Sequence, residues 1–271
     1  MTSKTTTYRL FEGKDHAQLY AKYRPSYPKE LYDKIKDYCQ QSDATKLDVA
    51  IDVGCGSGQS TLPLTNICKH VIGIDISRAQ IAEAKKVASD IDFRVGQAED
   101  LGFLGDGTVD LVTTATAIHW MDIPTLMGEV SRVLRPGGVV AVYSFAPDVI
   151  HNKEAHQLVW EDFFNGTLRG CGSDAHIHYI NGLALIDLPF KDAIRLEPLM
   201  TEREVDVDFF IGFIKSCSSW QVFQKKNPDS NVLIDLRLRL RTLYGDSTSG
   251  EVRPMSLSTP VYTLLGRKGN L

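Results

Sequence analysis

The sequence predicts an α/β fold in which a mostly parallel sheet carries helices on both faces and a helical cap. Three observations support this prediction. Short apolar runs alternate with helix-like stretches from residue 47 to 145, a glycine cluster follows the first run, and the regular pattern is lost from residue 148 to 254. Repeated strand–helix–strand units form parallel sheets with right-handed crossovers. Ligands of such sheets bind at the carboxyl ends of the strands.

Two helices are predicted before the sheet, at residues 15–23 and 29–40. Pro25 and Pro28 separate them, because proline lacks a backbone donor and disfavours helical geometry in the residue before it. The second helix carries apolar side chains at three- and four-residue spacing, which is typical of a helix with one buried face. We expect this N-terminal segment, residues 1–44, to form a helical lid.

The sheet itself is predicted from five apolar runs, at residues 49–53, 71–74, 92–95, 111–114 and 139–145. Helices are predicted between these runs at residues 60–68, 81–88 and 123–134. A later run at 262–265 is expected to complete the sheet in antiparallel fashion. We therefore expect a single domain, 1–271, with a core at about 45–147 plus 255–268 and a cap insertion at 148–254.

The composition is that of an ordinary globular protein. Hydrophobic residues make up 43% of the 271 residues, charged residues make up 24%, and the net charge is −4, which argues against a dedicated nucleic-acid-binding surface. No apolar run reaches the roughly 18 to 20 residues of a membrane span, and the N-terminus lacks the apolar core of a signal peptide. The five cysteines are scattered and odd in number, which favours reduced thiols. We expect a cytoplasmic protein.

The strongest local signal is the glycine cluster after the first predicted strand. Asp52 ends the apolar run, and Gly54, Gly56 and Gly58 follow at two-residue spacing. Glycine lets a backbone turn sharply and approach a ligand closely. The dinucleotide-binding pattern GxGxxG has glycine where this chain has Gln59, which disfavours a nicotinamide oxidoreductase. A tight turn without a ligand is the alternative interpretation.

A second acid follows the next predicted strand. Asp75 comes directly after the run at 71–74, where a carboxylate can accept hydrogen bonds from both hydroxyls of a ribose. Asp75 could also cap the helix that follows Ser77.

These motifs, together with residues 96–101, 110–112 and 134–138, resemble class I S-adenosylmethionine-dependent methyltransferases of the type 11 kind in order and spacing. The resemblance implies a Rossmann-like, seven-stranded, mostly parallel sheet, S-adenosylmethionine as the cofactor and methyl transfer as the activity. Many family members have aspartate at the position of Gln97, so this chain departs from the pattern there. The implied cofactor-binding residues are Asp52, Gly54, Cys55, Gly56, Gly58, Asp75, Ile76, Gln97, Ala98 and Ala115.

The flanking segments narrow this resemblance. Residues 11–28, 117–120, 216–220 and 264–268 resemble the small-molecule branch that includes trans-aconitate methyltransferases, which esterify a carboxylate. The acceptor is therefore expected to be a small molecule, with a carboxylic acid as the first candidate. The implied substrate-binding residues are Tyr20, Tyr23, Trp120, Ser216 and Trp220. An amine, hydroxyl or macromolecular acceptor and a catalytically silent cofactor-binding regulator are the alternatives.

His119 and Arg24 are the candidate catalytic residues. A carboxylate acceptor needs no general base at neutral pH, since its reference pKa is about 4, whereas an amine or hydroxyl usually needs one. His119 could transfer a proton or only shape the pocket beside Trp120. Arg24 could pair with an acceptor carboxylate, or it could be an exposed surface residue. Ser216 and Trp220 are expected on one face of a cap helix, with core packing as the alternative for Trp220.

Two further patterns are given no functional role. His176 and His178 lie near Cys171 and Asp174, but a structural zinc site usually needs four ligands, so no metal is predicted. Arginine and leucine alternate at residues 236–241, which favours a short amphipathic strand, with a helix end as the alternative. We expect a monomer or a weak homodimer.

Overall fold

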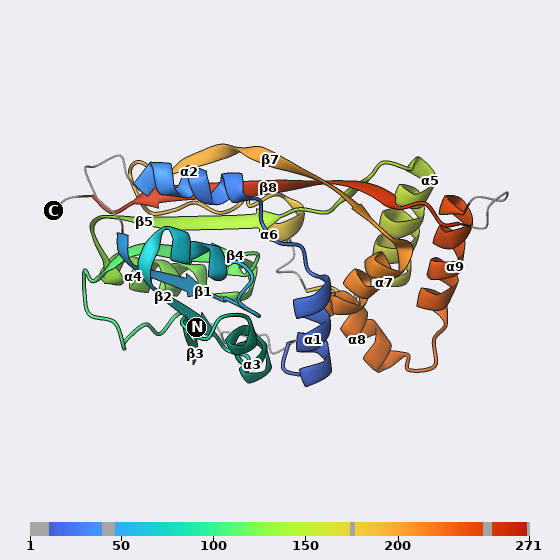
Figure 1. The fold of residues 1–271 in the computed structure, drawn as a ribbon, viewed down its shortest axis with the longest axis horizontal. Coiled ribbons are helices and arrows are strands. Elements are labelled where there is room, and N and C mark those ends of the chain that lie inside the picture. The colour runs from blue at the N-terminus through green and yellow to red at the C-terminus, as the bar shows by residue number, and fades with distance from the viewer. Residues whose placement is uncertain (1–10, 40–46, 174–176, 246–250, 270–271) are drawn as a thin grey trace, which may run out of the picture.

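The computed structural model describes residues 11–39, 47–173, 177–245 and 251–269. A sheet with its flanking helices forms one half of the elongated molecule, and a group of helices forms the other half (Figure 1). Helix α1 (Lys14–Tyr23) stands between the halves, and the long strands β7 (Ile194–Val205) and β8 (Met255–Arg267) reach across both.

The sheet confirms the predicted α/β class. In the described residues it has eight strands, in the order β3-β2-β1-β4-β5-β8-β6, with β7 paired to β8. The first five strands run parallel, and β8 is antiparallel to both β5 and β7. The remaining strands are β1 (Leu47–Val53), β2 (Cys68–Asp75), β3 (Asp92–Val95), β4 (Val109–Ala115), β5 (Leu134–Phe145) and the two-residue β6 (Val149–Ile150).

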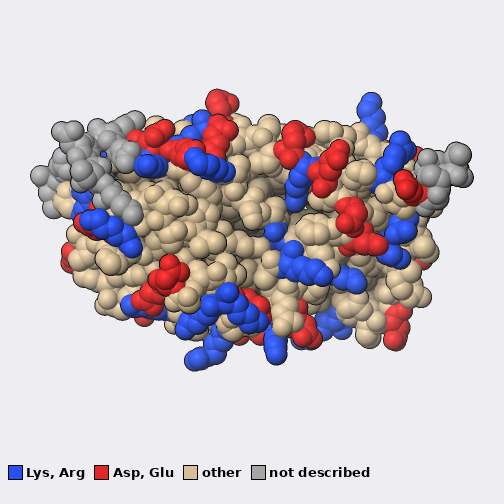
Figure 2. Space-filling view, viewed as in Figure 1, with Lys and Arg blue, Asp and Glu red and all other residues tan. Residues whose placement is uncertain are grey.

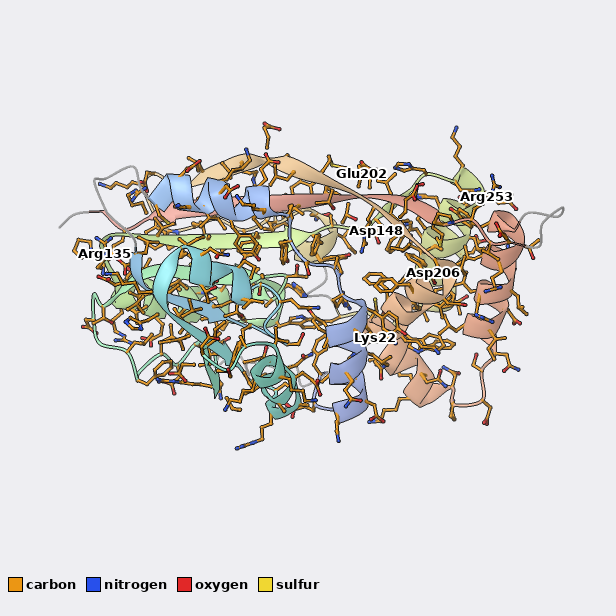
Figure 3. The ribbon with its side chains drawn as sticks, viewed as in Figure 1. Lys22, Arg135, Asp148, Glu202, Asp206 and Arg253 are labelled. Atoms are coloured by element: carbon orange, nitrogen blue, oxygen red, sulfur yellow. The ribbon has the colours of Figure 1, made fainter. Side chains whose placement is uncertain are left out.

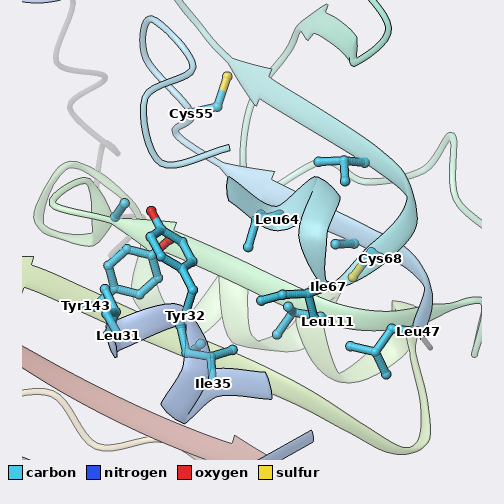
Figure 4. Close-up of a cluster of buried hydrophobic side chains, with 14 of the residues drawn as sticks. Leu31, Tyr32, Ile35, Leu47, Cys55, Leu64, Ile67, Cys68, Leu111 and Tyr143 are labelled. Atoms are coloured by element: carbon cyan, nitrogen blue, oxygen red, sulfur yellow. The ribbon is translucent and has the colours of Figure 1, made fainter. Parts of the chain in front are cut away.

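Helices cover both faces of the sheet. Helix α2 (Lys29–Cys39), the 3₁₀ helix η1 (Leu62–Asn66) and helix α3 (Arg78–Val87) pack on one face, and α4 (Ile123–Val133) packs on the other. Side chains alternate along β5, so Tyr143 joins the first core and Val142 the second. Figure 4 shows Tyr32 of α2 beside Tyr143, with ring centroids 6.3 Å apart. Burial on both faces explains why β1, β4 and the second half of β5 are rich in apolar residues.

Two predicted elements near the sheet have to be corrected. The helix predicted at 60–68 is only the five-residue η1, because β2 already begins at Cys68, opposite Leu47 of β1. Strand β7 falls inside the segment predicted as a cap, 148–254. Its residues are exposed or half-buried, so no apolar run marks it. Pro198 and several charges fit an edge strand.

The strand favoured at residues 236–241 is wrong. The segment belongs to helix α9 (Val232–Tyr244), in which Leu233, Leu236 and Leu240 recur at helical spacing and are buried. Two of the arginines, Arg237 and Arg241, lie one turn apart and both pair with the carboxylate of Asp208.

The helices of the other half form a cap with its own hydrophobic core. They are α5 (Lys153–His156), the π-helix η3 (Gln157–Thr167), α7 (Val207–Ser216), α8 (Ser218–Lys226) and α9, and the short α6 (Ile177–Ile180) lies closer to the sheet. Cys217 has an extended backbone and separates α7 from α8. The single helix predicted there is therefore wrong, and Ser216 and Trp220 do not share a helix face. In the described part of the chain, no helix combines the length and apolarity that a membrane span requires.

Candidate functional site

A cavity of about 1220 Å³ lies between the carboxyl ends of the parallel strands and the cap. Ligand pockets are typically about 300–1,000 Å³, so this space exceeds that of a single small ligand. The cavity is lined by eleven of the residues predicted from the sequence, namely Tyr20, Arg24, Gly54, Gly56, Asp75, Ile76, Gln97, Ala98, Ala115, His119 and Trp120.

The glycine loop forms one end of the cavity. Gly54 and Gly56 have φ angles of +71° and +53°, in the left-handed region that favours glycine. The backbone amide of Gly56 donates to Oδ2 of Asp75 at 2.9 Å, and the amide of Ser77 donates to Oδ1 at 2.8 Å. Burial raises the pKa of Asp75, while these two bonds oppose the rise. The helix cap is Ser77 itself, which accepts from the amide of Gln80, so Asp75 is left to face the cavity.

Three predicted cofactor residues of this region do not line the main cavity. Asp52 is fully buried and accepts hydrogen bonds from the hydroxyls of Ser60, Thr61 and Thr113 at 2.7–2.8 Å. Cys55 packs in the core on the α2 face, and burial raises the pKa of its thiol well above the usual value. A Cβ atom on Gly58 would lie 2.9 Å from the ring of Phe93. These three residues therefore support the glycine loop from the side that faces the protein core.

Arg24 projects from the end of α1 into the cavity. Its Nε donates to Oγ of Ser216 at 3.0 Å and its Nη2 donates to the carbonyl oxygen of Ser216 at 3.1 Å. The guanidinium lies 4.9 Å from the ring centroid of Tyr20 and 5.1 Å from that of Phe213. Arg24 is half-buried and takes part in no ion pair with the residues that the structure describes. The alternative of an exposed surface arginine is therefore wrong.

The other predicted substrate residues lie behind the cavity wall. Ser216 is fully buried and holds Arg24 in place. Tyr23 packs on α7, with its ring 5.2 Å from that of Phe209. Trp220 is buried in the cap core between Phe163 and Phe223, so the core-packing alternative describes it.

Gln59 joins the glycine loop to helix α1. Its side-chain amide donates to the carbonyl oxygen of Ala21 at 3.1 Å and to that of Arg24 at 3.4 Å. In the sequence Gln59 is noticeable only as a missing glycine, and no role was predicted for it. Gln59 and Arg24 are 35 residues apart in the sequence, so no local sequence pattern indicates their contact.

The floor of the cavity follows β4. Thr116 has a φ of +46°, which is uncommon for a β-branched residue, and its hydroxyl lies 2.5 Å from that of Tyr27. His119 is buried with its ring centroid 4.6 Å from that of Trp120. Phe11 packs edge-on against Trp120, so the start of the described chain lies over this floor.

The cap supplies residues that were not predicted from the sequence. Trp160 and Phe164 line the cavity from η3, and Asp148 lines it from the segment after β5. Figure 3 shows Asp148 where the sheet meets the cap, whereas Arg135, which pairs with Asp110, lies at the opposite end of the sheet. The four-residue spacing of Trp160 and Phe164 is a signal that could have been noticed.

The structure does not describe the side chains of His176 and His178, for which no metal binding is predicted. His176 and the side chain of His178 lie outside the described residues. Among the residues that are described, no group of three histidine, cysteine or acidic side chains could hold a metal ion.

Comparisons with known proteins identify the class that this fold and site define. A family profile described as a methyltransferase domain matches residues 51–142. A Dictyostelium discoideum protein that carries the name of a methyltransferase is 30% identical over 99% of this chain and 100% of its own length. A structure of a type II methyltransferase from Anaeromyxobacter dehalogenans superposes with a TM-score of 0.75 and 27% identity, covering 92% of this chain and all of that one.

Two further relatives match a smaller share of their length. A Saccharomyces cerevisiae protein, named as an S-adenosylmethionine-dependent methyltransferase, is 33% identical over 71% of this chain and 65% of its own. A malonyl-[acyl-carrier protein] O-methyltransferase of Dechloromonas aromatica is 31% identical over 51% of this chain and 52% of its own.

The chain belongs to the class I S-adenosylmethionine-dependent methyltransferases. The predicted class, the transferase activity and the cofactor are thereby confirmed. The narrower resemblance to trans-aconitate methyltransferases stays a prediction.

Proposed function

We propose that this chain transfers the methyl group of S-adenosylmethionine to a carboxylate oxygen of a small acid, which binds beside Arg24 under the cap. The observation that carries the proposal is the environment of Arg24. Its guanidinium lines the cavity, is held by Ser216, and has no acidic partner among the described residues. Arginine stays charged in proteins, so a half-buried guanidinium in a cavity favours an anionic ligand.

The cofactor is assigned to the end of the cavity opposite the cap. Asp75 has both carboxylate oxygens fixed by backbone amides, and each oxygen retains a lone pair for a ribose hydroxyl. Gly54 and Gly56 would let the loop approach the methionine part, and Gln97 and Ala98 would meet the adenine. The donor and acceptor set therefore fits a nucleoside with an amino-acid tail. When bound, S-adenosylmethionine supplies an electrophilic methyl group on a positively charged sulfur.

The proposed reaction needs no proton transfer. The carboxylate oxygen would form a bond to the methyl carbon as the carbon–sulfur bond breaks, and the electron pair of that bond would stay on the sulfur. The products are a methyl ester and S-adenosylhomocysteine. The protein would contribute alignment of the two substrates and exclusion of water, and His119 would shape the floor with Trp120 instead of acting as a base.

Two observations favour this acceptor over the alternatives. The Dechloromonas relative is named as an O-methyltransferase of malonyl-[acyl-carrier protein], whose malonyl group carries a free carboxylate, so it supports the carboxylate as the accepting group and not the size of the acceptor. The face shown in Figure 2 mixes acidic and basic side chains without a large area of one sign, which does not favour an extended polyanion.

The test measures methyl transfer to carboxylic acids by mass spectrometry and uses their primary amides, which present no carboxylate oxygen, as inhibitors. Arg24→Gln should lower kcat/KM for the acid by about 10-fold or more, since a hydrogen bond to a charged group contributes about 1.5–3 kcal/mol. Arg24→Lys keeps the charge and should lower kcat/KM for the acid by a smaller factor. Binding of S-adenosylhomocysteine should change little in either variant. Equal losses in the kcat/KM of the acid and in the affinity of the amide would contradict the proposed charge pairing.

A further inference from the structure

We infer that the cap end of the cavity is a subsite for a flat, apolar body of the acceptor, formed by the side chains of Trp160 and Phe164. This inference rests on the proposed function for the position of the carboxylate. It adds the class of acid, which is one that carries an aromatic or similarly planar group.

Trp160 and Phe164 present a preformed apolar surface. Their rings stack with centroids 4.8 Å apart and planes 26° apart, and both residues are half-buried at the cavity wall. The indole N–H of Trp160 donates to the backbone oxygen of Asp148 at 2.7 Å. This bond uses the only donor of the indole, so its ring faces can contact an apolar ligand without leaving a polar group unsatisfied.

A second layer of aromatic rings holds this surface rigid. Phe164 packs edge-on against Phe163, which stacks on Trp220, and Trp220 stacks on Phe223. Phe163 and Trp220 are each 4% exposed, whereas Trp160 and Phe164 in front of them reach the cavity. A wall whose rings are already ordered loses little conformational entropy when a ligand binds.

The backbone of η3 also distinguishes this segment. It forms a π-helix over Gln157–Thr167, and the amide of Leu168 continues the pattern by donating to the carbonyl oxygen of Phe163 at 2.8 Å. Hydrogen bonds between residues five apart place side chains four apart on nearly the same face, which aligns Trp160 with Phe164. π-Helices are rare and occur frequently at functional sites.

The aromatic surface and Arg24 belong to one cavity. Phe213 lines the same cavity and lies with its ring centroid 5.1 Å from the Arg24 guanidinium, so apolar lining begins directly beside the charge. A volume of about 1220 Å³ leaves room for an acceptor in addition to the cofactor. One acid could therefore place its carboxylate at Arg24 and its body against Trp160 and Phe164.

The test is calorimetric binding to the full chain in the presence of S-adenosylhomocysteine. The probes are 3-phenylpropionate, 3-phenylpropionamide and butyrate. Phenylpropionate should bind about 10-fold more tightly than butyrate, because a buried aromatic group contributes about 1.5–3 kcal/mol. Trp160→Leu and Phe164→Leu should remove most of this difference, with little effect on butyrate. Phe103→Leu is the matched control, since Phe103 is 42% exposed and does not line the cavity.

The outcomes separate this inference from the proposed function. Equal binding of phenylpropionate and butyrate by the unmodified chain would overturn the subsite. The subsite is also overturned if phenylpropionate binding depends on Arg24 but not on Trp160 or Phe164, and the carboxylate proposal would then stand. If phenylpropionamide binds as well as the acid and both need Trp160, the subsite is supported and the carboxylate proposal fails. Unchanged binding of S-adenosylhomocysteine by each variant shows that the variants are folded.

Discussion

The side-chain amide of Gln59 donates a hydrogen bond to the backbone carbonyl oxygen of Arg24, and a second one to that of Ala21. Gln59 lies in the turn after the glycine loop, and Arg24 ends the lid helix. The loop assigned to the cofactor is thus tied to the cation assigned to the acceptor. A well-ordered glycine loop is therefore expected to hold Arg24 in position.

The first prediction concerns this link. Gln59→Leu keeps the size of the side chain but removes both donors, so Arg24 should be less well positioned. We expect the KM for the acid acceptor to rise about 3- to 10-fold, in line with about 0.5–1.5 kcal/mol for a hydrogen bond, while the Kd for S-adenosylhomocysteine changes less. Gln224→Ala, which removes an exposed bond in α8, is the control. An equal effect on both ligands would show that Gln59 only stabilises the fold.

The second prediction concerns the ribose end of the cavity. Asp75→Ala removes the carboxylate that faces the cavity and also frees the amides of Gly56 and Ser77. Calorimetry with S-adenosylhomocysteine should show binding weaker by about 10-fold or more. Asp75→Asn keeps one acceptor oxygen and should lose less. If Asp75→Ala binds as tightly as the unmodified chain, Asp75 does not hold the ribose.

The sequence predicts the central sheet well because both of its faces are covered. Every residue of β4 is buried and four of its seven residues are apolar, and such apolar-rich strands can be recognised locally. Strand β7 has no buried face of its own and was missed. Residues 236–241, which belong to α9, favour a strand with a helix end as the alternative, because arginine and leucine alternate over only six residues, which is too short to separate the two periods.

The candidate site also combines residues that a local sequence pattern predicts with residues whose positions depend on tertiary contacts. The glycine loop and Asp75 are recognisable because a cofactor-binding turn is formed by neighbouring residues. The position of Arg24 depends on Ser216, 192 residues away, and the wall of Trp160 and Phe164 depends on how the cap folds over the sheet. Asp52 was assigned to the cofactor from its place in the motif. Its burial under three hydroxyl groups follows from tertiary packing.

The third prediction concerns the packing of the lid on the cap. A Cβ atom on Gly212 of α7 would overlap the ring of Tyr23. Gly212→Ala should therefore destabilise the fold by about 1–3 kcal/mol in urea unfolding, despite the better helix propensity of alanine. In a Tyr23→Leu background, Gly212→Ala should lower the free energy of unfolding by a smaller amount. Gly128→Ala in α4, where no atom lies within 4 Å, should instead stabilise the fold by about 0.5–1 kcal/mol. Equal effects at Gly128 and Gly212 would contradict the proposed clash.

The fourth prediction concerns the pH dependence of stability. Burial raises the pKa of Asp52, although three hydroxyl donors oppose the rise, so the folded state holds this proton more tightly than the unfolded state. The contribution of Asp52 to stability is therefore largest below its unfolded pKa of about 3.9 and is lost as the pH rises through the higher folded pKa. Asp52→Asn cannot ionise and lacks this loss. The free energy of unfolding of Asp52→Asn, minus that of the unmodified chain, should increase with pH above about 4.

Asp48→Asn provides a control of opposite sign for this measurement. The ammonium of Lys69 lies 2.6 Å from the exposed Asp48 carboxylate and lowers its pKa, so its contribution is present above the unfolded pKa and is lost as the pH falls. The free energy of unfolding of Asp48→Asn, minus that of the unmodified chain, should therefore decrease with rising pH. The decrease should be slight, because exposed ion pairs contribute little to stability. Urea unfolding from about pH 2 to 7 measures both differences, since the Asp48 contribution changes below its unfolded pKa of about 3.9. Parallel pH profiles for Asp52→Asn and the unmodified chain would mean that Asp52 titrates alike in the folded and unfolded states.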